Sequence, residues 1–166
     1  KPEGPWIHDG KTFFIRDGHL CFDIGWVGVV TGEKKITDGS WHHVAFAWNP
    51  WEDRVVLYVD GEEDGEGHLP PGSPVEDTIM QIGFTAENFP EDPWFSGYID
   101  GIRIYSGFLD EAMIHAVATE TGEPLVRAYG VRGDLAARFV LQEESDSAGE
   151  GKGVIVFGAT DHDRRG

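Results

Sequence analysis

Short apolar runs, separated by Gly, Asp, Asn and Pro, recur along most of the chain and predict β-strands. Side chains alternate between the two faces of a strand, so hydrophobicity with a period of two marks extended chain. We expect strands near 12–16, 19–24, 26–31, 41–48, 54–60, 78–84 and 97–105, with two further candidates near 135–141 and 153–158. The pattern is typical of an antiparallel β protein.

The run "WHHVAFAW" at 41–48 is apolar on both faces. Alternation places His42, Val44, Phe46 and Trp48 on one face and Trp41, His43, Ala45 and Ala47 on the other. A strand of this kind belongs in the middle of a two-layer structure, where both faces are covered. The next run, "RVVLYVDG", follows after "NPWED" and predicts a hairpin, with Asp60 and Gly61 ending its second strand.

Two segments depart from this strand pattern. The stretch 62–77, "EEDGEGHLPPGSPVED", is acidic and rich in Gly and Pro, so we expect an exposed, mobile loop. The stretch "FLDEAMIHAVATETG" has apolar residues at helical spacing and predicts one short helix with Gly122 as its stop. The final "TDHDRRG" is expected to be a frayed tail.

Length and charge limit the function classes. The 166 residues suit a single domain over 1–166, and the sequence reads as a mature piece of a longer protein. Asp and Glu number 30 against 13 Lys and Arg, for a formal net charge of -17, which argues against nucleic acid or anionic lipid as a partner. The sequence holds no apolar run long enough for membrane insertion. The lone Cys21 is expected to be a buried small hydrophobic residue.

The adjacent histidines are interpreted as structural. His42 and His43 point to opposite faces of one strand, so they cannot share a metal without a distorted backbone. Each is expected to pack under aromatic side chains and to form hydrogen bonds, with His42 the more buried of the two.

A set of motifs carries a resemblance to a known family. The order "DGSWHHVAFAW", "VVLYVDGE", "IGF" and "FSGYIDGIRIYSGFLDEAMI", over about residues 11–120, resembles the bacterial laminin-G-like, concanavalin-A-like jelly-roll domains. The resemblance implies an all-β fold, a two-sheet antiparallel jelly-roll sandwich with one short helix. The opening strands of that family are not recognisable here, and residues 124–166 are expected either to complete the sheet edge or to begin a following repeat.

Related sandwiches with glucanase activity place a pair of carboxylates on one strand. The corresponding Glu-x-Asp-x-x-Glu motif does not occur in this sequence, which argues against an enzyme but does not exclude one. Asp100, in "GYIDGIRIY", shares a predicted face with Tyr98, Ile102 and Ile104, so its carboxylate is expected to face inward. A buried carboxylate needs backbone amides, an Arg or a cation as a partner. A structural calcium ion is one candidate, because related sandwiches often hold one and oxygen ligands are plentiful in these loops.

Loop tryptophans give the binding hypothesis. Trp51 and Trp94 lie in polar loops beside Asp53 and Asp92, and sugar rings stack on exposed aromatic rings while carboxylates bind their hydroxyls. The alternative is that these tryptophans only anchor their loops. Trp6 and Trp26 are further candidates, although the sequence around Trp26 favours a core position.

The leading hypothesis is a noncatalytic carbohydrate-binding module, a lectin, of a larger protein. Its partner would be a polysaccharide or other glycan, and its calcium would be structural. The alternatives are a structural or adhesion module that binds neighbouring domains or another protein at a cell surface, and a glycoside hydrolase or lyase domain. The family resemblance implies an extracellular or periplasmic location.

Overall fold

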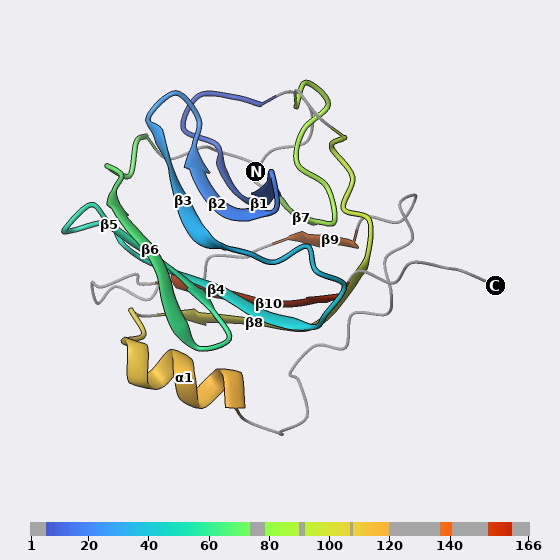
Figure 1. Ribbon diagram of the computed structural model, residues 1–166. Helices are drawn as coiled ribbons and strands as arrows, with labels where there is room; N and C mark the ends of the chain where they lie inside the picture. Colours follow the sequence, from blue (N-terminus) through green and yellow to red (C-terminus); the bar gives the residue numbers. More distant parts are fainter. Residues whose placement is uncertain are drawn as a thin grey trace.

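The computed structural model describes residues 6–73, 79–89, 92–106, 108–119, 137–140 and 153–160, and Figure 1 shows how they are arranged. The strands are β1 (Lys11–Arg16), β2 (His19–Ile24), β3 (Gly28–Lys35), β4 (His42–Asn49), β5 (Arg54–Val59), β6 (Glu62–His68), β7 (Ile79–Ile82), β8 (Tyr98–Ser106), β9 (Ala137–Val140) and β10 (Gly153–Thr160), and the helix α1 spans Glu111–Thr119. In the described part of the chain, no helix is long and apolar enough to cross a membrane.

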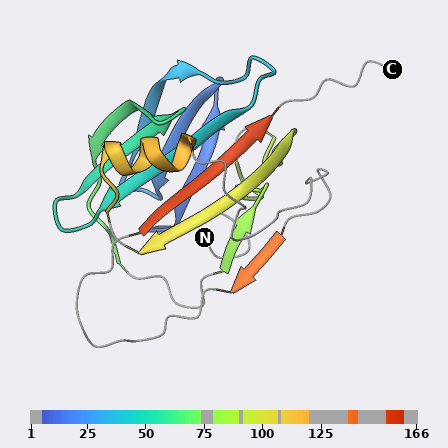
Figure 2. The same cartoon turned by 90° about the horizontal axis from the view of Figure 1, so that it is seen from below.

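The strands form two facing layers. A three-stranded sheet has the order β1-β2-β3, and a five-stranded sheet has the order β6-β5-β4-β10-β8. Every pairing is antiparallel, and a smaller sheet joins β7 to β9. Figure 1 shows the three-stranded sheet on one side of the five-stranded sheet and α1 on the other, and Figure 2 shows α1 across the outer face. The predicted all-β sandwich with one short helix is confirmed.

The main core lies between the two layers and comes from the inward-facing positions of both sheets. Its buried residues are Leu20, Phe22, Ile24, Val30, Ile36, Val44, Phe46, Val55, Leu57, Val59 and Leu69. The rings of Phe22 and Phe46 stack across the layers at a centroid distance of 4.3 Å. Full burial of one such side chain contributes about 1.5–3 kcal/mol, so this layer is the main source of stability.

A second core lies on the outer face of the five-stranded sheet. Ala45 and Ala47 of β4 are fully buried there, and the fully buried Ile114 of α1 packs in the same cluster. The Oδ1 atom of Asp110 accepts a hydrogen bond from the backbone N–H of Met113 at 2.9 Å, which caps the helix at its start. The predicted stop at Gly122 and the predicted frayed tail lie outside the described residues.

Asp-Gly pairs close two of the hairpins. Asp17 and Gly18 join β1 to β2, and Asp60 and Gly61 join β5 to β6; all four residues have positive φ angles, from 54° to 88°. Two-residue turns of this type match the twist of the strands they connect. The predicted β4–β5 hairpin is also confirmed, with Asn49 paired to Arg54.

The prediction of a mobile acidic loop from residue 62 onward was wrong for residues 62–68. These residues form β6, an edge strand paired with β5. Asp64 is buried, and its Oδ1 atom accepts a hydrogen bond from the backbone N–H of Lys34 on β3 at 2.7 Å. Gly32 permits this approach, since a Cβ atom there would collide with the Asp64 carboxylate. The glycines and the acidic side chain of this segment thus allow β6 to lie close to β3.

Trp26 is the second correction. It was expected in the core, but its side chain is 71% exposed. The strand that was expected from residue 26 begins at Gly28, and Trp26 lies in the preceding turn with φ at 62°. Cys21 is buried and free, as predicted.

The C-terminal strand β10 does not extend the sheet at its edge. It lies inside the five-stranded sheet, paired with β4 on one side and β8 on the other. The order of these three strands is visible in Figure 2.

Candidate functional site

A cavity of about 260 Å³ opens between the three-stranded sheet and the segment that leads from β7 to β8. Most of its lining is apolar. The lining residues are Phe13, Phe14, Ile15, Leu20, Thr37, Val44, Gln81, Ile82, Gly83, Phe84, Thr85, Phe89, Asp92, Pro93, Trp94, Phe95, Ser96 and Ile99. Two of the predicted ligand-binding residues, Trp94 and Asp92, are among them.

Backbone hydrogen bonds hold the segment that carries Trp94. The N–H of Thr85 donates to the carbonyl of Pro93, and the N–H of Phe95 donates to the carbonyl of Gly83, each at 2.9 Å. These bonds flank an isolated β-bridge between Phe84 and Trp94. The segment is therefore pinned in a hairpin-like conformation, which fixes the position of the indole.

Trp94 keeps contact with both the cavity and solvent. Its ring lies 4.6 Å from that of Phe84, and 41% of the residue remains exposed. Asp92 is exposed, and its Oδ1 atom accepts the backbone N–H of Trp94 at 3.0 Å. A carboxylate has two oxygens and about four acceptor positions, so Asp92 retains acceptor capacity beside the indole.

Gln81 is a polar residue in the lining of the cavity. It lines the cavity from β7, and its Oε1 atom is buried with no hydrogen-bond partner among the residues that the structure describes. Sequence reasoning did not select Gln81, Phe84 or Phe89. Gln81 lies at a polar position within an apolar strand, and this break in the pattern was the one signal that could have drawn attention to it.

The other predicted pair, Trp51 and Asp53, lies elsewhere. Trp51 is 75% exposed in the turn of the β4–β5 hairpin, and its backbone N–H donates to Oδ1 of Asn49. That turn and the segment between β7 and β8 lie at opposite ends of the molecule (Figure 1). The two tryptophans therefore do not form one platform.

Trp6 has a supporting position beside the cavity. Its ring stacks on Phe89 at 5.4 Å and meets the edge of Phe14 at 5.5 Å, and both of these residues line the cavity. Its Nε1–H donates to Oδ1 of Asp23 at 2.9 Å. These contacts place Trp6 behind the lining residues Phe14 and Phe89.

Asp100 corrects a further prediction, since it is exposed and does not face inward. The pairing register of β8 with β10 shifts at this point, and Gly101 has a φ of 63°, so a bulge breaks the simple alternation of faces. Ile99 and Ile102 are the buried residues, while Oδ1 of Asp100 accepts the N–H of Gly101 at 2.7 Å. Among the described residues, no three His, Cys, Asp or Glu side chains are grouped so as to hold a metal, and calcium binding by Asp100 stays a prediction.

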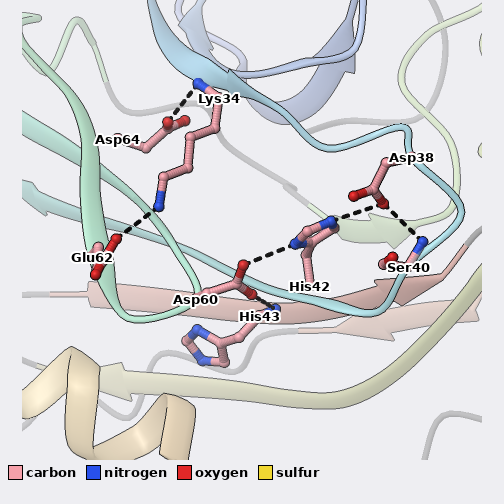
Figure 3. Close-up of polar contacts among 8 residues, drawn as sticks. All are labelled: Lys34, Asp38, Ser40, His42, His43, Asp60, Glu62 and Asp64. Atoms are coloured by element: carbon pink, nitrogen blue, oxygen red, sulfur yellow. Dashed lines mark hydrogen bonds and ion pairs between the residues drawn. The ribbon is translucent and has the colours of Figure 1, made fainter.

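A polar cluster surrounds the start of β4, shown in Figure 3. The Nδ1 atom of His42 lies 2.9 Å from Oδ2 of Asp60, and its Nε2 atom lies 3.1 Å from Oδ1 of Asp38. The other oxygen of Asp60 accepts the backbone N–H of His43 at 3.0 Å. The cluster joins the β3–β4 connection, β4 and the β5–β6 turn.

The two histidine rings lie on opposite sides of β4, as predicted, but their environments are the reverse of the expectation. Both ring nitrogens of His43 are buried and have no hydrogen-bond partner in the described part of the chain. Burial lowers the pKa of His43 to about 4, so the ring is neutral near pH 7. Its face of the strand is the one covered by α1, which offers apolar side chains.

The carboxylate partners of His42 determine the direction of its pKa shift. Burial alone would lower the pKa of His42, but the hydrogen bonds to Asp60 and Asp38 outweigh it and raise the pKa above its ordinary value. The cluster is an ion-pair clamp whose strength depends on protonation of this ring.

The fold defines a two-layer antiparallel β-sandwich domain. The chain belongs to the concanavalin A-like lectin/glucanases superfamily, because the laminin G family model of that superfamily matches residues 9–115. The match ends within α1, before β9 and β10.

Two curated proteins show the relation to larger molecules. The chain is 30% identical over 135 residues to the mouse protein named "Sushi, von Willebrand factor type A, EGF and pentraxin domain-containing protein 1", and 29% identical over 129 residues to its rat counterpart. The alignments cover 73% and 70% of this chain but about 4% of each relative. The chain thus corresponds to one small part of a multidomain protein, and no solved structure matches it.

Proposed function

We propose that this domain is a noncatalytic carbohydrate-binding module of a larger extracellular or periplasmic protein, and that the cavity beside Trp94 holds the sugar. The observation that supports the proposal most is the pairing of an exposed indole with an exposed carboxylate at a preformed cavity. Sugar rings place their C–H faces on indoles, and their hydroxyls bind carboxylates. Support for a larger parent protein comes from the small share of each relative that the chain covers.

A glycan array with matched variants tests this proposal. The unchanged protein should bind at least one glycan, and Trp94→Ala should weaken that binding by about tenfold or more, which corresponds to about 1.4 kcal/mol. Asp92→Asn should weaken it less, because the amide oxygen still accepts a hydrogen bond.

Trp51→Ala is the matched control, since Trp51 is more exposed than Trp94 but lies far from the cavity. Binding that survives Trp94→Ala and fails in Trp51→Ala or Asp53→Asn would move the site to the β4–β5 turn. An array with no hits would count against carbohydrate binding altogether, and turnover of a polysaccharide would contradict the noncatalytic part.

A second candidate function is adhesion to another protein or to a neighbouring domain. It is favoured by Trp26 and Trp41, which are 71% and 57% exposed and do not line the cavity. Large exposed aromatic side chains are typical anchors of protein interfaces. This candidate predicts an array without hits, together with a complex between this domain and an adjoining domain that Trp26→Ala weakens in sedimentation experiments.

Calcium remains a prediction. If a structural calcium ion binds, melting curves should show a higher midpoint with calcium than with a chelator, because ligands of the native state stabilise it by mass action. Equal midpoints would remove calcium from the proposal. Asp100→Asn should abolish any shift that depends on this side chain.

A further inference from the structure

The cavity next to Trp94 has an apolar interior. Its buried lining residues all carry apolar side chains, namely Phe14, Leu20, Val44, Ile82, Phe89 and Ile99. The Oε1 atom of Gln81 is itself buried, so a ligand in the cavity does not reach it. A hydroxyl group that enters this interior gives up its hydrogen bonds to water and gains none in exchange. The interior therefore selects against hydroxyl groups.

The polar groups that a ligand can reach lie at the mouth of the cavity. Thr37, Asp92 and Ser96 belong to the lining and are exposed to solvent, whereas the Thr85 hydroxyl already donates to the carbonyl of Pro93 at 3.2 Å. Thr37 lies in the β3–β4 connection, and Asp92 and Ser96 lie in the segment between β7 and β8, so two parts of the fold supply these groups. A hydroxyl both donates and accepts, and a carboxylate accepts. The mouth therefore suits hydroxyl groups, and the interior suits a group without polar atoms.

The cavity volume limits how much of a glycan can enter. A cavity of about 150 Å³ holds a benzene molecule, which is a single six-membered ring. The observed cavity, of about 260 Å³, therefore takes one six-membered ring with a substituent but not two rings. A glycan can enter only with a terminal unit, while the rest of the chain stays outside.

We infer that the cavity recognises a terminal 6-deoxyhexose, a sugar whose ring carries a methyl group in place of the usual hydroxymethyl group; this inference rests on the proposed function. The methyl group occupies the apolar interior. The ring hydroxyls face Thr37, Asp92 and Ser96 at the mouth, and the C–H face of the ring lies against the exposed indole of Trp94. A hexose in the same orientation would bury its 6-hydroxyl without a hydrogen-bond partner.

The test compares sugars that differ by a single oxygen atom. L-Fucose and L-galactose share the configuration of every ring carbon, as do L-rhamnose and L-mannose, and only the second member of each pair carries a 6-hydroxyl. Ligand-observed NMR titrations would measure the affinities, because they tolerate weak binding. We expect about tenfold tighter binding of the 6-deoxy member of at least one pair, since the other member buries a hydroxyl without a hydrogen bond.

Two further measurements locate the methyl group and the hydroxyls of the bound sugar. In saturation-transfer spectra of the unchanged protein with L-fucose or L-rhamnose, the methyl protons should give the strongest signal, because buried side chains surround them. Ser96→Ala removes a hydroxyl at the mouth and leaves the interior unchanged. This variant should therefore weaken the binding of both members of a pair by a similar factor and keep the ratio of their affinities.

Val44→Thr is the variant that changes the interior. Threonine has nearly the shape of valine and adds a hydroxyl to the wall of the cavity, so the 6-hydroxyl of a hexose gains a partner there. The preference for the 6-deoxy sugar should shrink as a result. The saturation-transfer experiment on the unchanged protein tests the inference even if this variant folds poorly.

The outcomes separate the inference from the proposed function. Equal affinity for both members of every pair, or tighter binding of the hexose, would overturn the 6-deoxyhexose assignment; carbohydrate binding would stand if Trp94→Ala still weakened it. A saturation-transfer maximum at the ring protons would overturn the position of the methyl group. Failure of the glycan array to find any sugar would overturn both the inference and the proposed function.

Discussion

The two faces of β4 differ in the size of their side chains and in what covers them. On the inner face, Val44 and Phe46 meet the three-stranded sheet, and Phe46 stacks on Phe22. On the outer face, Ala45 and Ala47 meet a cluster that includes Ile114 of α1. A sheet facing another sheet needs large side chains to fill the layer between them, whereas small side chains allow a helix to approach closely. The same contrast extends to the two histidines, since carboxylates bind both ring nitrogens of His42, whereas those of His43 are buried without a partner among the described residues.

The largest effect is expected on the inner face. Phe46→Ala removes a buried aromatic ring and leaves a cavity between the sheets, so it should lower the free energy of unfolding by about 3–5 kcal/mol. Chemical denaturation with fluorescence detection would measure this change. A cost below about 1 kcal/mol would show that the two sheets do not pack through this ring.

Overpacking of the outer face should have a smaller effect. Ala47→Leu adds bulk where the sheet meets the α1 cluster, and such insertions cost about 1–3 kcal/mol. The same denaturation experiment applies, with Ala112→Leu on the exposed side of α1 as a control that should be close to neutral. A neutral Ala47→Leu would indicate that α1 does not cover this face tightly.

The clamp at the start of β4 should contribute less still. Asp60→Asn keeps an acceptor for the N–H of His43 but removes the charge opposite His42, so a loss of about 1 kcal/mol is expected. The pKa of His42, followed by NMR titration, should fall in this variant. Asp38→Asn should lower it too, and an unchanged pKa in both variants would contradict the clamp.

The smallest and most specific effect is the pH dependence of the two rings. The pKa of His42 is raised in the folded protein. Its contribution to the stability of the fold is therefore present below its ordinary pKa and is lost as the pH rises through the raised value. The pKa of His43 is lowered to about 4 in the folded protein. The contribution of its neutral ring to stability is therefore present above its ordinary pKa and declines as the pH falls toward about 4. Asp60 lies near both rings, and Arg103 further disfavours a charged His43.

Melting curves over this pH range distinguish the two rings. His42→Gln should flatten the alkaline side of the stability profile, and His43→Gln should flatten the acid side. Identical profiles for both variants would refute the assignment of opposite environments to the two faces.

Much of the sandwich could be predicted from the sequence because period-two hydrophobicity is a local signal. The β4–β5 hairpin, the helix and the extended segment at 153–158 are found where they were expected. The strand β6 was missed because Glu, Asp and Gly are depleted in strands. Tertiary contacts override this tendency where β6 packs against β3. The Asp60–Gly61 turn, with its hairpin signature, could have predicted β6.

The candidate site was less accessible to sequence reasoning. Trp94 and Asp92 were selected as a loop tryptophan with an adjacent acid, and they line the cavity. Gln81 was not, because the burial of its oxygen depends on surfaces from distant parts of the chain. The sheet face on which Asp100 lies could not be predicted from the alternation of side chains along β8, because one bulge residue, Gly101, reverses that alternation.

The position of β10 has a consequence for how the molecule assembles during synthesis. The two strands that flank it, β4 and β8, leave the ribosome first and have no direct pairing to each other. Until β10 is made, each presents an unpaired backbone edge, which another chain could join. The nascent protein therefore passes through an interval in which β10 competes with strands of other chains for the same position between β4 and β8.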